Sequence, residues 1–403
     1  MSENGFNRRQ FLGRAGVSVV GAGVLASAAG NAAPAAGADE RKQGSSGASL
    51  FDKIYGCLAG TYIGSSMGVA VEGWHMDRIA KEYGVLKQFK PFRFKGWDCP
   101  PGSTEDGMER QKLMCRAIIE KQDRITAEDL VDTWRKVMDD EKTAAMAKTT
   151  EGFDRDLMAL AKTRAVPAGQ LGTLVKYSHL NTTVRSCHAI ALINACDPEG
   201  VIRDLYDVAR VYQPLSSDGY PWGAAYNAAL VDAMKPDATV QSVIDTALRY
   251  ATGGVRGEIQ RALDIAKKYD NPLDMRKEFY QSYSGTGTAY AQSWVNETAA
   301  KALAVFAASK GNVQDAIIVA VNFGRDTDCL GASAGGLAGA FSGTRTIPPE
   351  WIETVDNATQ SHPYTNSRLT IKKTAEGLYG ALQNKVRKMK DYVTLMESQF
   401  QAR

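Results

Sequence analysis

Apolar residues recur at three- and four-residue intervals along most of the chain after residue 50, which is the pattern of helices buried on one face. The alternation of apolar and polar residues that indicates strands is nearly absent, and no fixed-period repeat indicates a solenoid. We therefore predict an all-α chain. The spacing predicts helices over 51–66, 107–120, 127–138, 201–212, 239–250, 257–268, 298–309, 312–322 and 366–398.

The first 50 residues lack this helical pattern. The hexapeptide from Asn7 to Leu12, NRRQFL, precedes a short run of small apolar residues, and an A-x-A cleavage site follows at Ala36-Gly37-Ala38. This arrangement resembles a twin-arginine export signal, so we expect a periplasmic or extracellular protein. The expected organisation is a signal peptide over 1–38, a flexible linker over 39–50 and a single catalytic domain over 51–403.

The charge of the mature chain is close to neutral. Removing residues 1–38 takes away three arginines and one glutamate and leaves a formal net charge of +1. Such a balance gives no electrostatic signature of a nucleic-acid partner. We find no later apolar run long enough to cross a bilayer, so we also expect no stable membrane insertion once the signal is removed.

Several common catalytic centres are absent from the sequence. The six cysteines form no C-x-x-C motif, the four histidines form no metal-binding pair, and no G-x-S-x-G sequence marks a nucleophilic serine. The glycine run from Gly331 to Gly339 does not follow a strand, which argues against a dinucleotide site. We expect most cysteines to be unpaired and buried.

Two carboxylates stand one residue apart late in the chain. Asp326 and Asp328 follow Gly324-Arg325 and precede residues 331–340, GASAGGLAGA, whose side chains are too small to fill space. Another backbone or a ligand must therefore approach this helix closely. Hard carboxylate oxygens suit Mg²⁺, Mn²⁺ or Ca²⁺ better than zinc. The same residues also suit a helix N-cap, and the spacing alone leaves both interpretations open.

A second acidic cluster, Thr104-Glu105-Asp106, stands directly before the helix predicted over 107–120. These residues too could cap a helix. If the two clusters meet, their oxygens could hold two divalent cations a few ångströms apart. Such a pair can bind vicinal hydroxyls and acidify a bound water.

Three stretches together resemble the ADP-ribosylglycohydrolase family: LAGTYIGSSMGVAVEG (58–73), PGSTEDGM (101–108) and FGRDTDCLGASAGGLAGAFSG (323–343). Their order and approximate spacing match the family over about residues 51–350. The resemblance implies a compact orthogonal multi-helix bundle with a binuclear Mg²⁺ or Mn²⁺ site. It also implies hydrolysis of the bond at the anomeric carbon of a ribose, aided by carboxyl groups that position water.

The resemblance assigns roles residue by residue. The metal ligands it implies are Thr104, Glu105, Asp106, Asp326 and Asp328, with Cys329 a doubtful sixth. The catalytic residues it implies are Glu72, Glu105 and Asp106, although Glu72 could instead be an exposed helix-end charge. The substrate-binding residues it implies are Asn181, Thr182, Arg185 and Arg325.

The sequence departs from the family pattern at five of its positions. Ser65 stands where the family has an aspartate, and Glu105 replaces the shorter aspartate of its triplet. Cys329 replaces a threonine ligand with a soft sulfur, which suits Mg²⁺ and Mn²⁺ poorly. Arg325 and Thr182 each replace a glycine. The metal ligands are therefore largely kept while the phosphate-binding part is altered.

We predict an exported metal-dependent glycohydrolase that cleaves the anomeric bond of an N- or O-linked riboside, either ADP-ribosyl or nucleoside-like, with activated water. One alternative is a non-catalytic relative that binds a ligand or serves a structural role. Another is an α/α-barrel polysaccharide hydrolase, for which Trp74, Trp97 and Trp222 could be sugar platforms.

Overall fold

The computed structural model describes residues 47–138, 152–175, 178–283 and 293–401. These segments belong to one compact unit that extends from Gln43 to Arg403. The predicted signal peptide and most of the predicted linker lie outside the described residues. The signal peptide, the linker and the domain boundaries therefore stay predictions.

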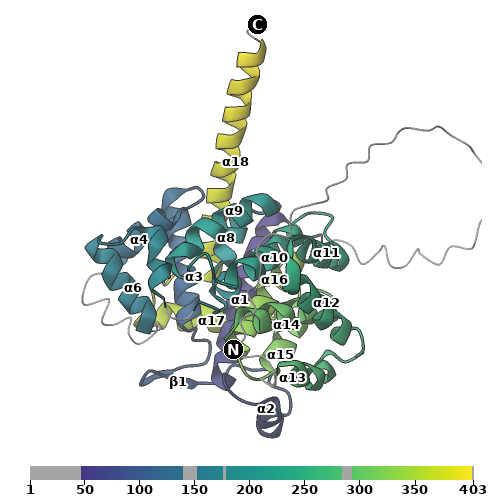
Figure 1. The fold of residues 1–403 in the computed structure, drawn as a ribbon. Helices are drawn as coiled ribbons and strands as arrows, with labels where there is room; N and C mark the ends of the chain where they lie inside the picture. The colour runs from purple at the N-terminus through teal and green to yellow at the C-terminus, as the bar shows by residue number, and fades with distance from the viewer. Residues whose placement is uncertain (1–46, 139–151, 176–177, 284–292, 402–403) are drawn as a thin grey trace, which may run out of the picture. The chain divides into compact units, whose positions relative to one another are not determined.

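The regular structure of the described residues is helical apart from two short strands, which confirms the all-α prediction (Figure 1). The α-helices are α1 (Leu50–Gly68), α2 (Met76–Tyr83), α3 (Asp106–Lys121), α4 (Ala127–Val137), α6 (Gly152–Thr163), α7 (Thr182–Arg185), α8 (His188–Leu192), α9 (Pro198–Val208), α10 (Gly219–Ala233), α11 (Val240–Tyr250), α12 (Gly253–Ala266), α13 (Arg276–Tyr283), α14 (Val295–Ala308), α15 (Val313–Val321), α16 (Thr327–Ser342), α17 (Pro349–Ser361) and α18 (Ile371–Gln401). The 3-10 helices are η2 (Val69–Val71), η3 (Ala168–Leu174), η4 (Ala209–Val211) and η5 (Pro272–Met275).

The two strands, β1 (Phe92–Phe94) and β2 (Trp97–Cys99), form an antiparallel hairpin in which Phe92 lies opposite Cys99. Every helix range predicted from the apolar spacing overlaps an observed helix. The spacing missed α10, because this helix is buried nearly all round and its sequence, GYPWGAAYNAALVDA, has no polar face.

Helices α1 and α16 pack on each other at the centre of the fold through glycines four residues apart. A Cβ built on Gly60 or Gly64 would lie closer than 3.0 Å to the backbone of α16, at Gly335 and Gly331. The converse holds for Cβ atoms built on those two α16 glycines. The close approach predicted for the small-residue helix is therefore made by another backbone, and Figure 1 shows the two helices together in the middle of the molecule.

This packing is antiparallel. Gly56 near the start of α1 meets Gly339 near the end of α16, whereas Gly68 at the end of α1 meets Thr327 at the start of α16. The Thr327 hydroxyl donates to the Gly68 carbonyl at 2.8 Å, which fixes the alignment. As a result, the residues that follow α1 and the residues that precede α16 lie at the same end of the helix pair.

One stretch in the described part of the chain, Leu50–Val71, is long and apolar enough to cross a membrane by length and composition. The expectation that no apolar run after residue 38 is long enough to cross a bilayer is therefore wrong. Of its most apolar window, 89% is buried inside the fold, as in a core helix. The stretch comprises α1 and η2, and glycines on α1 pack on α16.

The six cysteines are unpaired, and all but Cys196 are buried, in line with the sequence expectation.

The C-terminal helix α18 differs from the others. Its first half packs on the fold through side chains such as Leu378 and Leu382, while its second half is exposed and projects from the rest of the unit (Figure 1, yellow).

Candidate active site

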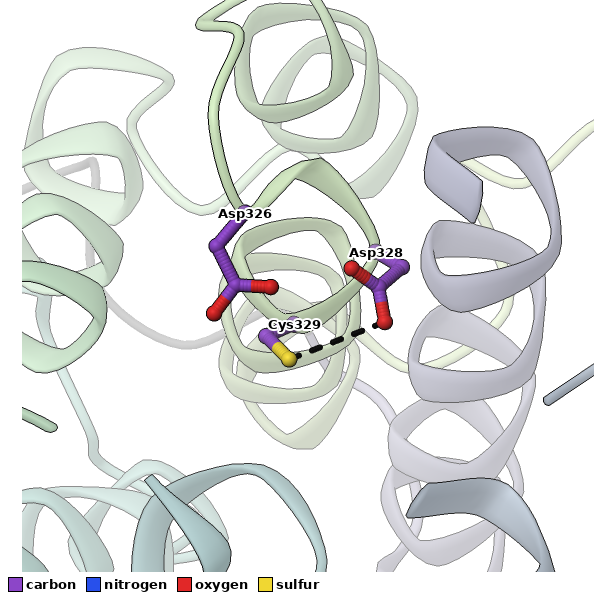
Figure 2. Close-up of side chains that lie close together, drawn as sticks. All are labelled: Asp326, Asp328 and Cys329. Atoms are coloured by element: carbon purple, nitrogen blue, oxygen red, sulfur yellow. Dashed lines mark hydrogen bonds between the residues drawn. The ribbon is translucent and has the colours of Figure 1, made fainter. Parts of the chain in front are cut away.

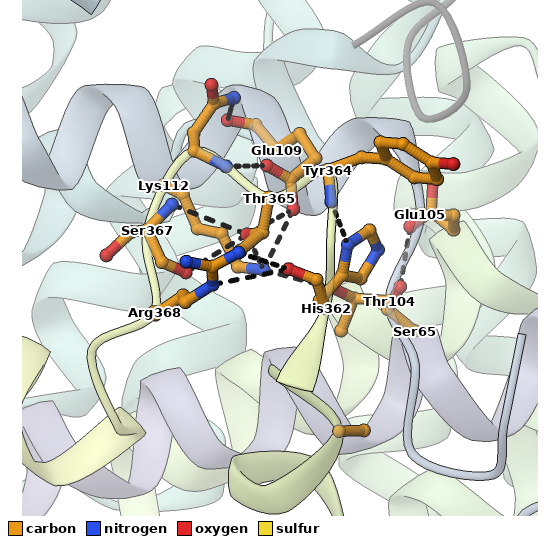
Figure 3. Close-up of polar contacts among 12 residues, drawn as sticks. Ser65, Thr104, Glu105, Glu109, Lys112, His362, Tyr364, Thr365, Ser367 and Arg368 are labelled. Atoms are coloured by element: carbon orange, nitrogen blue, oxygen red, sulfur yellow. Dashed lines mark hydrogen bonds and ion pairs between the residues drawn. The ribbon is translucent and has the colours of Figure 1, made fainter. Parts of the chain in front are cut away.

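Glu105 forms the N-cap of α3 and is held there from two sides. Its Oε2 accepts a hydrogen bond from the Gly107 N–H at 2.9 Å. This N–H lies in the first turn of α3, where the helix itself supplies no acceptor for it. Its Oε1 accepts from the Ser65 hydroxyl at 2.6 Å (Figure 3). Ser65, which stands where the family has an aspartate, therefore links the last turn of α1 to the start of α3.

Asp326 occupies the N-cap position of α16, yet its side chain makes no capping bond. Its Oδ2 accepts instead from the Asn181 amide at 2.8 Å. Asp328 lies in the first turn of α16, and its Oδ2 accepts from Arg185 at 2.8 Å. The remaining oxygens, Oδ1 of Asp326 and Oδ1 of Asp328, are buried without a hydrogen-bond partner. Figure 2 shows both carboxylates beside the first turn of α16, with Cys329 between them. The capping interpretation therefore does not account for this pair.

Arg185, at the end of α7, joins the two acidic helix starts. Its guanidinium forms a salt bridge with Glu105 and another with Asp328, and the Nη2 atom lies 3.9 Å from Oδ1 of Asp106. The side chain is only 2% exposed. Carboxylates that are more than 200 residues apart in the sequence thus meet around one buried guanidinium group, that of Arg185.

Glu72 reaches the same site because two loops are bonded to each other. The Gly73 N–H donates to the Arg325 carbonyl at 2.7 Å, and the Arg325 N–H donates to the Trp74 carbonyl at 2.8 Å. Gly324 permits this approach, because its φ is +77° and a Cβ there would lie closer than 3.0 Å to the Trp74 carbonyl. Glu72 itself is exposed. Among the carboxylates of the site it is the most exposed.

Most of these groups line a cavity of about 260 Å³. It is lined by Glu72, Asp106, Arg110, Leu180, Asn181, Arg185, Ser293, Asp326, Asp328 and Cys329. A larger cavity, about 480 Å³, is lined by residues such as Lys112, Arg116 and Leu369 and contains none of the predicted site residues. The smaller cavity is the candidate site because the acidic groups converge there.

Burial and neighbouring charges shift the ionisation of these groups. Burial, with Asp328 and Glu72 adding to it, raises the pKa of Asp326 well above its ordinary value. Burial also raises the pKa of Glu105, with Arg185 acting in the opposite direction. For Asp106, burial is outweighed by Arg110 and Arg185, which lower its pKa. Negative charge is therefore crowded on the α16 side of the cavity and balanced on the α3 side.

The donor set fits a hard divalent cation on the α16 side. Ligand atoms of Asp326, Asp328 and Cys329 lie within 4.8 Å of one another. Each of the two aspartates also has one buried oxygen without a hydrogen-bond partner. Carboxylate oxygens are the ligands that Mg²⁺ and Mn²⁺ prefer. Cys329 suits them less, because burial raises the pKa of its thiol well above the ordinary value and the thiol lies 3.6 Å from Oδ2 of Asp328.

Four predicted residues do not line the cavity. One of them, Glu105, instead contacts Arg185, which does line it. The hydroxyl of Thr104 accepts from Lys112 at 3.3 Å, in a buried network with Glu109 and Thr365 (Figure 3). Thr182 is buried at the start of α7. The Arg325 guanidinium is held by both oxygens of Glu297, at 2.8 and 2.9 Å. Their ligand and substrate roles stay predictions.

Sequence reasoning missed Arg110, which lines the cavity and forms a 3.1 Å salt bridge with Asp106. Its guanidinium also donates to both oxygens of the buried Asp154. The four-residue spacing between Asp106 and Arg110 is a helical acid–base pair, a signal that could have been noticed. Asp154 is 44 residues further along the chain and gave no local signal.

A model of the ADP-ribosylglycohydrolase family matches residues 46–387 of this chain. The chain belongs to the ADP-ribosylglycohydrolase family. A solved structure of an ADP-ribosylglycohydrolase-related protein complex has the same fold, with a TM-score of 0.58 at 15% identity. That match covers 83% of this chain and 99% of the other. The comparison confirms the predicted fold type and speaks against an α/α-barrel polysaccharide hydrolase.

Two curated relatives carry names of enzymes that act on ADP-ribose linkages. The ADP-ribosylarginine hydrolase Tri1 of Pseudomonas putida is 47% identical over 47 residues, a match that spans 12% of this chain and 13% of Tri1. The ADP-ribosyl-[dinitrogen reductase] glycohydrolase of Rhodospirillum rubrum is 22% identical over 313 residues, or 77% of this chain and 92% of that protein. Family membership supports a hydrolase that acts on ADP-ribosyl linkages.

Proposed function

We propose that this protein is an exported glycohydrolase, dependent on Mg²⁺ or Mn²⁺, that cleaves the anomeric bond of an N- or O-linked riboside. The observation that carries the proposal is the pair of buried, partnerless oxygens on Asp326 and Asp328 in the cavity that Glu72 also lines. A buried carboxylate oxygen without a partner is costly, and a bound cation would satisfy both. The same cavity offers an accessible carboxylate for proton transfer.

Asp326 and Asp328 would hold the ion, and Asn181 orients Asp326 through its 2.8 Å hydrogen bond. When bound, a divalent cation polarises the oxygens it contacts and makes water more acidic. The Glu72 carboxylate is placed to take the proton from the attacking water, and among the three predicted catalytic residues it is the most exposed. Asp106 stays ionised beside Arg110 and suits stabilisation of positive charge at the anomeric centre.

The size of the cavity supports a ribosyl group as the part of the substrate that is enclosed. About 260 Å³ lies below the usual range for ligand pockets, so the leaving group would remain outside. The substrate is therefore either an ADP-ribosylated molecule or a smaller, nucleoside-like riboside. The twin-arginine motif favours the smaller substrate, because ADP-ribosylated proteins of the cytosol would be out of reach of an exported enzyme.

The test is release of free ribose or ADP-ribose by purified protein from a panel of ribosides and ADP-ribosylated substrates, with Mg²⁺ or Mn²⁺ and with EDTA. Release that requires the cation supports the proposal. No release from any member of the panel, together with no binding of Mn²⁺ in a calorimetric titration, would instead support a non-catalytic relative. The altered residues Cys329 and Ser65 are what keep that second candidate open.

Export has its own test. Replacing Arg8 and Arg9 with lysine removes the arginine pair on which a twin-arginine signal depends. The variant is expected to stay in the cytosolic fraction, whereas the unchanged chain appears outside it. Equal distribution of the two proteins would contradict export by this route and leave the enzyme proposal untouched.

A further inference from the structure

The Arg185 guanidinium occupies the place between the two acidic helix starts, where the sequence predicted shared cations. It contacts Glu105 from α3 and lies 2.8 Å from Oδ2 of Asp328 on α16. The Nε atom of Arg185 makes no hydrogen bond. The guanidinium is therefore held by its contacts with the carboxylates of Glu105 and Asp328. A fixed positive charge thus already bridges the two ligand clusters.

The space for this guanidinium is built into α3. A Cβ on Gly107 would overlap the Nη1 atom of Arg185, so a larger residue at this position would displace the guanidinium. Gly107 follows Asp106 directly and also supplies the N–H that binds Glu105. The glycine and the arginine therefore fit together as a unit, at the start of the helix that was predicted to bind metal.

Two sets of carboxylate oxygens at the starts of α3 and α16 differ in their partners. Oδ2 of Asp328 and the carboxylate of Glu105 are engaged by Arg185, whereas Oδ1 of Asp326 and Oδ1 of Asp328 have no partner. An ion bound between α3 and α16 would have to share the space and the oxygens that Arg185 occupies. An ion bound by the two partnerless oxygens would not.

We propose that Arg185 takes the place of one of the two expected cations, so that the site holds a single divalent ion at Asp326 and Asp328. This inference rests on the proposed metal dependence. In place of the two metal ions that the sequence predicted, the site would contain one bound divalent ion and the positive charge of the Arg185 side chain. Guanidinium is suited to this position because its planar donors match carboxylates and it stays charged when buried.

The test is the number of Mn²⁺ ions bound per chain, measured by calorimetric titration and by metal analysis of the gel-filtered protein. The unchanged chain is expected to bind one ion, with an electron paramagnetic resonance spectrum of isolated Mn²⁺. Arg185→Met removes the charge and keeps much of the side-chain length. It is expected to bind two ions with the spectrum of a coupled pair, and to gain more thermal stability from Mn²⁺ than the unchanged chain.

Two further variants make the result interpretable. Gly107→Ala keeps Arg185 but pushes its guanidinium out of the bridge, so it should also bind a second ion. Arg116→Met removes a half-exposed arginine that pairs with Glu120 and should bind one ion like the unchanged chain. Two ions in the unchanged chain, or one ion in Arg185→Met, would overturn the inference and leave metal dependence standing. No ion in any of these proteins would overturn metal dependence as well.

A second, independent feature is an apolar stripe on the projecting half of α18. Val386, Met389, Val393, Met396 and Phe400 are spaced alternately by three and four residues. Val386, Met389, Val393 and Phe400 are 42% to 72% exposed. The family match ends at residue 387, so nearly all of this stripe lies beyond the part shared with the family. A narrow stripe with this spacing is the contact surface of a coiled coil.

We infer that this stripe, defined by the five residues above, binds the same stripe of a second copy of the chain in antiparallel orientation. Aligning Val393 with Met396 of the second copy also places Met389 opposite Phe400. The residues beside the stripe then pair by charge, because Lys390 lies next to Glu397 of the second copy, twice per dimer. A parallel alignment would instead bring Lys390 near Lys385, which are like charges.

The test is sedimentation equilibrium of the full chain over a range of concentrations. The unchanged chain is expected to dimerise, and Lys390→Glu or Glu397→Lys should each weaken the dimer by about tenfold, because attraction becomes repulsion at two sites. The double variant Lys390→Glu, Glu397→Lys should restore the dimer. A monomer at all concentrations, a double variant that stays weak, or binding of α18 to anionic lipid vesicles without dimerisation would overturn the inference.

Discussion

Gly64 of α1 and Gly331 of α16 meet so closely that a Cβ on either would lie less than 3.0 Å from the backbone of the other. Their contact holds the helix that leads to Glu72 against the helix that starts at Asp326. Gly64→Ala is therefore expected to force the helices apart and to lower the free energy of unfolding by about 1 to 3 kcal/mol or more. Urea titration followed by circular dichroism measures this change.

The matched control is Gly257→Ala in α12, where a Cβ would meet nothing within 4 Å. There the substitution only restricts the unfolded chain, so the free energy of unfolding should rise by roughly 0.5 to 1 kcal/mol. Equal effects of the two substitutions would contradict the close packing of α1 on α16.

Asp326→Asn is expected to weaken ion binding and to raise the free energy of unfolding of the ion-free protein. Asp326 is buried beside Asp328, and Glu72 adds to the negative charge around it. Replacing its carboxylate with the neutral amide of asparagine should therefore stabilise the ion-free protein. It should also lose the thermal stabilisation by Mn²⁺, which for a single site at 100 times the dissociation constant is worth about 2.7 kcal/mol. Scanning calorimetry with Mn²⁺ and with EDTA tests both effects. A variant that is still stabilised by Mn²⁺ as strongly as the unchanged chain would show that the ion binds elsewhere.

Glu72→Gln is expected to lower kcat by about 10² to 10⁴, the usual contribution of a positioned general base. Because Glu72 is exposed, the free energy of unfolding should stay within about 0.5 kcal/mol of the unchanged value. Steady-state kinetics, with Mn²⁺ affinity as the control, separates the loss of a base from loss of the ion. An unchanged kcat would remove Glu72 from the proposed chemistry.

His362 makes stability depend on pH. Burial lowers its pKa from 6.5 to about 4, with Glu109 opposing the shift. Because the unfolded chain then takes up the proton first, the contribution of this residue is present above about pH 6.5 and is lost as the pH falls toward 4. The loss is at most about 3 kcal/mol. His362→Gln should flatten the dependence of the unfolding free energy on pH over this range, and an equally steep profile would contradict the assignment.

The sequence predicted the features of the site that depend on local pattern. The small-residue run 331–340 indicated that another backbone or a ligand approaches closely, and the structure shows that α1 makes this approach. The spacing of Asp326 and Asp328 indicated oxygen ligands. What the sequence could not supply depends on which elements meet. Arg185 was expected to contact substrate, and its place between α3 and α16 follows only from how α7 packs.

The same limit explains the residues that do not line the cavity. Thr104 shares a helix start with Asp106, yet its hydroxyl binds Lys112, which a reading of adjacent residues does not anticipate. Arg325 directly precedes Asp326, but the buried Glu297 of α14 holds its guanidinium. Neighbours in sequence at a helix start point in different directions, so a motif fixes which residues are near a site more reliably than which of them face it.

The most direct test of the account is cation-dependent release of ribose or ADP-ribose, measured by chromatography, for the unchanged chain and for Asp328→Asn. We predict release that requires Mg²⁺ or Mn²⁺, is abolished by EDTA, and falls by at least about 10² in Asp328→Asn. Release that persists at full rate in EDTA and in Asp328→Asn would contradict a metal-dependent site at the start of α16.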